Sequence, residues 1–435
     1  MTVASLDAAP ADTRPRTGWL VPRRQAWFAF TLAFLLMTFD FVDRQVVVAM
    51  FPALKAAWGL SDKQLGALVS SVSITIAIFS FPIALLADRW SRVKSIAVMA
   101  VVWSTATIAC GFSRSYGQLL AARGIIGLGE AGYGAAGGAL LASMFPAARR
   151  ATVVSGFLAA ASVGSVLGVV LGGVVTARWG WQAAFGVVGV PGLVLALVFL
   201  KVRDYRTVPL VDKGTVRMRP GAVLRALLRP RSALAAYLAG ALQLVSASTL
   251  LAWLPSYFNR AYGLPVDQAG LKSAVVILLG SIGIVAWGYV ADRMASRDRR
   301  AKLLVPAACL IVTAALLVPA FGMMSPGSLQ FAFLCAGGFM MTAASGSVPS
   351  VAIDVIHPGL RATAAAMVAV VQNLFGLALG PLIAGALSDA YGLGTALAIM
   401  PLFCVASAFV LMAGARAYAG DLASAETLGV SITAN

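Results

Sequence analysis

Charged residues are scarce in this chain of 435 amino acids, because Asp, Glu, Lys and Arg together make up only 11% of it. Hydrophobic residues account for 60%, and the mean hydropathy is +0.89. A soluble globular protein carries about 25% charged residues, since its surface has to face water. The composition therefore excludes a soluble protein and predicts a membrane protein, so the lipid bilayer is its first expected partner.

Histidine and cysteine are nearly absent as well. His357 is the single histidine, which excludes a histidine-based metal site and a Ser-His-Asp triad. The four cysteines are Cys110, Cys309, Cys335 and Cys404. They lie in apolar stretches without metal-ligand spacing, so we interpret them as packing residues. The glycines of segment 127–134 lie inside an apolar span and form no nucleotide-binding loop. We predict no enzyme activity, no metal and no cofactor; a membrane receptor remains an alternative class.

Residues 1–24 lack the short apolar core and the cleavage site of a signal peptide, so the first apolar segment is expected to stay in the protein. Long apolar runs, in contrast, are frequent, and twelve of them reach the length of a membrane-spanning helix. They lie at 26–50, 64–87, 95–113, 118–143, 149–177, 181–201, 234–258, 268–292, 302–323, 327–355, 361–388 and 394–417.

Basic residues outnumber acidic ones by 33 to 16, and the net charge is +17. Most lysines and arginines fall on one side of the predicted membrane, in the N-terminal tail and in the turns that follow the even-numbered spans. This distribution is the positive-inside pattern. It predicts a multi-pass protein of the bacterial inner membrane with both termini in the cytoplasm, and it argues against nucleic acid as a partner.

The two halves of the chain repeat one pattern. Ala-Asp-Arg occurs at 87–89 and 291–293, and Arg-Ala-Thr occurs at 150–152 and 361–363. Matches in the same order, about 210 residues apart, indicate an internal duplication. We therefore predict an all-α membrane protein with twelve transmembrane helices in two pseudo-symmetric six-helix bundles. Its parts are a cytoplasmic N-terminal tail at 1–25, a first bundle at 26–201, a cytoplasmic linker at 202–233, a second bundle at 234–417 and a cytoplasmic C-terminal tail at 418–435.

Five ionisable side chains lie deep within these spans, where each is costly unless it is paired or faces water. The first span carries Asp40, Asp43 and Arg44, and the fourth carries Arg123 and Glu130. Asp40 and Arg44 are four residues apart, so they lie on one helix face. Arg123 and Glu130 are seven apart and also share a face. Acids can carry protons and arginines can hold an anion, which predicts a proton or solute pathway; a static network of buried ion pairs is the alternative.

Motifs over essentially the whole chain resemble those of the major facilitator superfamily. They are segments 43–44, 123–131, 181–185, 253–257 and 360–381. Within the superfamily the chain is similar to the Spinster-like transporters and the related anion–cation symporters. The resemblance implies that Asp43 and Glu130 are proton sites, with protons as the coupling ion. It also implies that Arg44 and Arg123 bind a substrate anion. Asp40 stands where these families often have Asn, so we include it among the proton-coupling residues and leave the proton count open.

Segment 88–94 resembles the superfamily's cytoplasmic signature between the second and third helices. An acid at a helix end can bridge to a neighbouring helix and hold the inner end of the transporter closed. The residues that we expect to act as this gate are Asp88, Arg89, Arg92, Asp292, Arg293 and Arg361. The alternative is that these charges only set the membrane topology.

Further polar or aromatic residues within the spans are candidates for the substrate cavity. They are Tyr133, Gln243, Trp253, Gln372 and Asn373. Asn373 matches a position in helix eleven that the resemblance implicates in substrate binding. For the others, hydrogen bonding between helices is an equally good explanation.

The predicted function is secondary transport by alternating access. We expect proton-coupled symport, into the cell, of a small organic anion such as a sugar acid or an aromatic or other monocarboxylate. The alternative is a Spinster-like, proton-linked exporter of a lysolipid or another amphiphile. Drug antiporters carry Gly-Pro in their fifth helix, and this chain has Gly168-Val169 there, which counts against drug antiport. We expect the transporter to be a monomer.

Overall fold

The computed structural model describes residues 19, 21–203, 220–357 and 360–430. Every regular element within these residues is helical. Twelve segments are long and apolar enough to cross a membrane, by length and composition. The prediction of an all-α membrane protein with twelve spans is thereby confirmed.

The helices divide into two halves at the linker. The first half contains α1 (Arg23–Ala49), α2 (Phe51–Trp58), α3 (Asp62–Arg89), α4 (Arg92–Gly111), α5 (Tyr116–Glu130), α6 (Tyr133–Met144), α7 (Ala147–Trp179) and α8 (Trp181–Phe199). The second contains α9 (Pro220–Leu228), α10 (Arg231–Ala261), α11 (Val266–Ala295), α12 (Ala301–Gly322), α13 (Ser328–Met341), α14 (Ala344–Asp354), α15 (Arg361–Val371), the π-helix η2 (Gln372–Leu377), α16 (Leu379–Tyr391), α17 (Leu393–Ile399) and α18 (Leu402–Val430).

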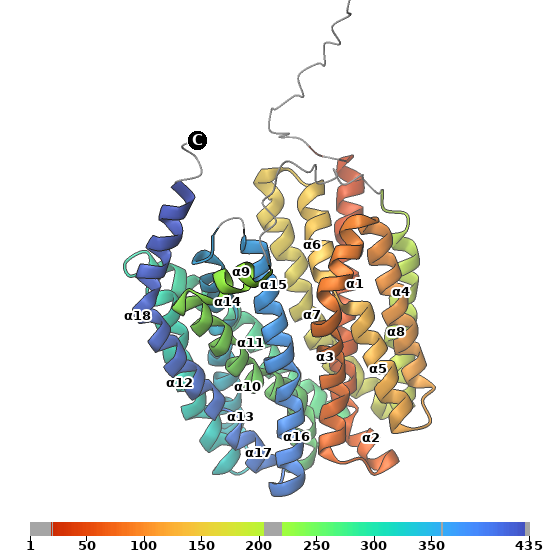
Figure 1. Ribbon diagram of the computed structural model, residues 1–435. Coiled ribbons are helices and arrows are strands. Elements are labelled where there is room, and N and C mark those ends of the chain that lie inside the picture. The colour runs from red at the N-terminus through yellow and green to blue at the C-terminus, as the bar shows by residue number, and fades with distance from the viewer. Residues whose placement is uncertain (1–18, 20, 204–219, 358–359, 431–435) are drawn as a thin grey trace, which may run out of the picture.

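Figure 1 shows the halves as two neighbouring bundles, one coloured red to yellow-green and the other green to blue. The start of α1 and the end of α18 lie at one end of the molecule, and α2 and the junction of α16 and α17 lie at the opposite end, which we call the far end. Across the boundary, α3 packs against α16 and α7 packs against α11. These pairs join the second span to the eleventh and the fifth to the eighth, as a duplicated six-helix unit requires.

Two helical segments lie in the parts of the chain that were predicted as a linker and a C-terminal tail. The predicted linker contains α9, which begins at Pro220 because proline is well tolerated in the first turn of a helix. The predicted C-terminal tail continues α18 up to Val430, since this segment is rich in alanine and other strong helix formers. Most of the remaining linker lies outside the described residues.

The fourth span is broken directly after Glu130. α5 ends there, and α6 starts at Tyr133 after Gly132, whose backbone is left-handed with φ 92°. Any residue with a Cβ atom is strained in this conformation, so the break depends on glycine. The tenth span is interrupted at the corresponding place, between α13 and α14.

Replacing Gly132 with Ala is therefore expected to destabilise the protein by about 1–2 kcal/mol, because alanine has to adopt the left-handed backbone. The measurement is the thermal unfolding midpoint of the purified protein in detergent. Gly134→Ala is the matched control, since Gly134 lies within helix α6 and a Cβ atom there meets no atom within 4 Å. An equal fall in both variants would contradict the assignment.

Candidate functional site

Asp43 and Arg123 form a buried ion pair between α1 and α5. The Arg123 Nη1 atom lies 2.9 Å from Asp43 Oδ2, and each side chain is only 1% exposed. Thr107 of α4 donates its hydroxyl hydrogen to Asp43 Oδ1 at 2.9 Å. The Nε–H group of Arg123 donates to the main-chain oxygen of Leu68 at 3.3 Å. Both charges thus have additional hydrogen-bond partners, which a buried pair needs to offset its lost hydration.

Arg44 joins the two other acids. Its Nε atom lies 3.0 Å from Asp40 Oδ1, and its Nη2 atom lies 2.8 Å from Glu130 Oε2. Both carboxylates are almost fully buried, whereas 22% of the Arg44 side chain is exposed. The guanidinium group also lies over the ring of Phe41, 5.0 Å from its centroid. Arg44 is therefore the most accessible charged group of this site.

We call the five ionisable residues the central network. Its members are Asp40, Asp43, Arg44, Arg123 and Glu130. Helix geometry explains the two parts: the four-residue spacing on α1 places Arg44 beside Asp40, and the seven-residue spacing on α5 separates its two ionisable groups by two turns. One of these groups therefore meets Asp43 and the other meets Arg44. The structure brings together all five residues that the sequence singled out.

A cavity of about 150 Å³ lies between the halves and reaches the central network. Arg44 and Arg123 both belong to its lining. Gln45 and Ser73 from the first half and Ser248 from the second add hydrogen-bonding groups. The cavity thus combines cationic and polar groups, which suits a small anion with further polar atoms.

A second cavity, of about 200 Å³, adjoins the first. Phe41, Ser165 and Leu251 line both cavities. The rest of its lining comes from α7, α10, α11, α13 and the turn after α13, and it is almost entirely apolar. This space suits an uncharged, apolar group, and the ring of Phe41, which lines it, also contacts the guanidinium of Arg44.

The other predicted substrate residues lie elsewhere. Tyr133, Gln243 and Trp253 are buried, and each donates a hydrogen bond to a main-chain oxygen of another helix. Gln372 and Asn373 lie in η2, where the Asn373 amide donates to a carbonyl oxygen of the preceding turn at 2.9 Å. Among the described residues that line the two cavities, none of these five occurs.

The predicted gating residues lie at the end of the bundle opposite the far end. Those with described side chains are Arg92, Asp292, Arg293 and Arg361. The first begins α4, the next two lie close to the end of α11, and the last begins α15. The last three are exposed. The side chains of Asp88 and Arg89 lie outside the described part of the chain.

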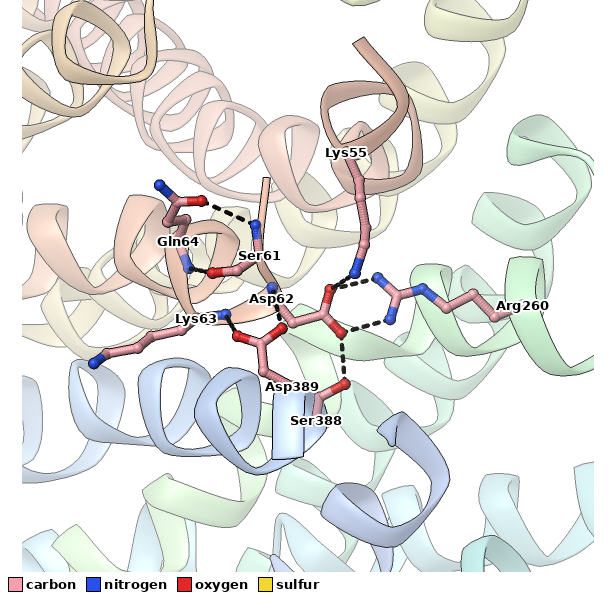
Figure 2. Close-up of polar contacts among 8 residues, drawn as sticks. All are labelled: Lys55, Ser61, Asp62, Lys63, Gln64, Arg260, Ser388 and Asp389. Atoms are coloured by element: carbon pink, nitrogen blue, oxygen red, sulfur yellow. Dashed lines mark hydrogen bonds and ion pairs between the residues drawn. The ribbon is translucent and has the colours of Figure 1, made fainter. Parts of the chain in front are cut away.

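Sequence reasoning missed two features. One is Thr107, because a threonine in an apolar span is common and gives no signal of its own. The other is a cluster of ion pairs at the far end, centred on Asp62 (Figure 2). Asp62 and its partner Arg260 are 198 residues apart in the chain, and each looks like an ordinary charge at a helix end.

Comparison with known families gives the site its context. The model of the family described as Major Facilitator Superfamily matches residues 32–381, which is most of the chain and includes the central network. The chain belongs to the Major Facilitator Superfamily. This confirms the predicted resemblance, and it identifies the chain as a multi-pass membrane transporter and not an enzyme.

Superfamily relatives of several kinds are similar to this transporter. A protein named MFS-type efflux pump, from Mycolicibacterium smegmatis, is 30% identical over 89% of this chain and 88% of its own length. A hexuronate transporter of Bacillus subtilis is 26% identical over 64% of this chain and 68% of its own length. Protein spinster homolog 1 of Xenopus laevis is 26% identical over 82% of this chain and 72% of its own length. The relatives thus differ in what their names say they transport.

The fold also matches a solved structure. A bacterial homolog of the human lysosomal transporter Spinster, in an inward-facing and unoccupied conformation, superposes with a TM-score of 0.84 at 19% identity. The match covers 92% of this chain and 99% of that structure. The chain therefore shares its fold with that structure.

Proposed function

We propose that this transporter is a proton-coupled symporter that carries a small organic anion into a bacterial cell across the inner membrane. The observation that carries the proposal is the central network at the edge of a cavity between the halves, where Arg44 and Arg123 supply cationic groups. A buried set of acids and arginines is costly to keep, and such residues usually mark a proton or ion pathway. The exposed part of Arg44 gives a carboxylate a route to the charged groups.

The charges of the central network support coupling to one proton. Three carboxyl groups face two guanidinium groups, so the network is neutral when one carboxyl holds a proton. When all three are ionised it carries one negative charge, which disfavours an anion in the adjoining cavity. A proton on Glu130, Asp40 or Asp43 would release part of an arginine's bonding capacity to the substrate. Proton and anion would then bind together, which is the condition for symport.

The two arginines have different parts in this scheme. Arg44 meets the substrate first, because 22% of its side chain is exposed at the cavity. Arg123 is 1% exposed and remains paired with Asp43 until that acid takes up a proton. A guanidinium group offers parallel N–H donors that match a carboxylate, which supports an acid as the substrate. Tyr133, Gln243 and the other three substrate candidates would act indirectly, through helix packing.

The small volume of the cavity beside the central network favours a compact substrate such as a sugar acid or an aromatic or other monocarboxylate. A specific observation also supports a second candidate, the export of a lysolipid or another amphiphile. The second, apolar cavity adjoins the one that Arg44 and Arg123 line, so a charged head and an apolar tail could occupy both. Relatives named spinster and efflux pump fit this second candidate, and the hexuronate transporter fits the first.

The remaining parts of the proposal concern organisation. The central network is complete within one chain, which supports a monomer as the transporting unit. The positive-inside pattern supports a cytoplasmic position for both termini, and with them for the predicted gating residues. The far end then faces the outside of the cell.

Transport by the purified protein in liposomes tests the proposal. With an acidic exterior and a neutral interior, labelled glucuronate or gluconate is expected to accumulate, and the accumulation should disappear when a protonophore removes the gradient. Liposomes without protein are the control. Movement of labelled lysophosphatidylcholine instead of either acid would favour the exporter, and movement of the acids without any dependence on the gradient would contradict proton coupling.

A further inference from the structure

At the far end, Asp62 forms ion pairs with basic residues of both halves. It is the first residue of α3, and its carboxylate is 3% exposed. Arg260 of α10 binds it with both terminal nitrogens, at 2.6 and 2.8 Å. Lys55 of α2 binds it at 2.6 Å, and the Ser388 hydroxyl of α16 donates to it at 2.5 Å. Figure 2 shows these side chains converging on one carboxylate.

A second acid ties the same helix end to the opposite half. The carboxylate of Asp389 on α16 accepts hydrogen bonds from the main-chain N–H groups of Asp62 and Lys63, at 2.8 and 2.9 Å. The first N–H groups of a helix have no partner inside the helix and carry partial positive charge. Asp389 supplies that partner from across the boundary, while the Lys63 side chain points away from the cluster (Figure 2).

The origin of each contact decides what the cluster can do. Lys55 and Asp62 belong to the first half, whereas Arg260, Ser388 and Asp389 belong to the second. Most of the contacts therefore exist only while the far ends of α3, α10 and α16 touch. A transporter of this architecture has to expose its cavity to each side in turn, by movement of one half against the other. Opening the far end has to break these contacts.

We propose that these five residues, the Asp62 cluster, form the latch that closes the far end and set the balance between its closed and open states. The inference needs only that the halves move apart at the far end, so it is independent of the substrate and of proton coupling. Arg260 is 30% exposed and Lys55 40% exposed, and a surface cavity of about 500 Å³ borders the cluster. Water can therefore hydrate these groups when the halves separate, so the contacts are reversible.

The cluster makes an asymmetric prediction for two cations of equal charge. Arg260 holds Asp62 only in the closed state, so Arg260→Gln should favour opening. In the described structure the side-chain partners of Asp62 are Lys55, Arg260 and Ser388. Only Lys55 belongs to the same half as Asp62, so it remains a partner after the halves separate. Lys55→Gln therefore removes an ion pair with Asp62 from both states. The loss is larger in the open state, where Asp62 has fewer other partners. Its effect on the balance should be absent or opposite.

Spin labels on the two halves measure this balance. Ala57 in α2 and Ser328 at the start of α13 are exposed at the far end, so both can be changed to Cys in a chain whose four native cysteines are replaced by Ala. Double electron–electron resonance on the purified protein in lipid nanodiscs then gives the distance distribution. We expect Arg260→Gln to raise the ratio of long to short distances by about threefold or more. An exposed but bidentate ion pair stabilises the closed state by a free energy that corresponds to about this factor.

Two further variants keep the test decisive. Ser388→Ala removes a single bond across the boundary and should shift the distribution in the same direction as Arg260→Gln by less, even if the latter folds poorly. Lys63→Gln removes a charge beside the cluster but outside it and should leave the distribution unchanged. The proposal is overturned if folded Arg260→Gln and Ser388→Ala both match the parent distribution, or if Lys55→Gln or Lys63→Gln shifts it toward long distances as strongly as Arg260→Gln.

Discussion

Glu130→Gln is expected to abolish the pH-driven accumulation of an organic anion. Exchange of labelled for unlabelled anion across the membrane should continue. Gln has the shape of protonated Glu and cannot release a proton, so the central network stays neutral in this variant. For symport of one proton with one monovalent anion, a gradient of one pH unit supports an accumulation of about tenfold, because each factor of ten is worth about 1.4 kcal/mol. The variant should show about equal concentrations on both sides.

Two comparisons make this result specific. Asp298→Asn removes an exposed acid whose carboxylate binds the Arg300 main-chain N–H outside the network, and it should keep the accumulation of the parent protein. Asp43→Asn should resemble Glu130→Gln, since Asp43 is the second predicted proton site. Parental accumulation in both Glu130→Gln and Asp43→Asn would show that neither acid couples the proton.

Substitutions of the two arginines are expected to affect different properties: stability for Arg123 and substrate affinity for Arg44. Arg123→Ala leaves the Asp43 carboxylate buried without its cation, and the loss of one partner of a buried pair costs about 3–5 kcal/mol of stability. Arg44→Lys keeps the charge but loses the two-pronged contact to Asp40 and Glu130. Its affinity for the transported acid should fall about tenfold or more, with a smaller loss of stability. Thermal unfolding in detergent and binding by calorimetry separate the two effects.

A double variant checks the interpretation of Arg123. Arg123→Ala with Asp43→Asn removes both charges, so it should recover part of the stability that Arg123→Ala loses. A static network of ion pairs predicts something else for Arg44, namely that folded Arg44→Lys binds the acid as tightly as the parent. Unchanged affinity in that variant would remove Arg44 from the substrate site and leave the network a purely structural role.

Much of the fold followed from the sequence, because the bilayer imposes simple rules. Each span needs a long apolar run, and hydropathy alone located eleven of the twelve spans to within four residues at both ends; the last was predicted to end at residue 417 and continues to Ala425. The repeated Ala-Asp-Arg and Arg-Ala-Thr motifs revealed the duplication. Buried charge is so costly in this setting that Asp43, Arg123 and Glu130 stood out without any knowledge of their neighbours. Helix α9 and the extension of α18 beyond residue 417 were not predicted, since local helix propensity decides them and no membrane limit applies.

The partners of these residues were decided only by the tertiary structure. Spacing along one helix explains why Arg44 contacts Asp40. The packing of α5 and α4 against α1 is what brings Arg123 and Thr107 to the Asp43 carboxylate. The same packing leaves 22% of the Arg44 side chain exposed and only 1% of Arg123, although both line the cavity. Two side chains of the same type give no sign of this difference in the sequence. The Asp62 cluster is the extreme case, because its members come from helix ends far apart in the chain. Contacts of this kind depend on how the two halves pack against each other, and sequence patterns within one half do not predict that packing.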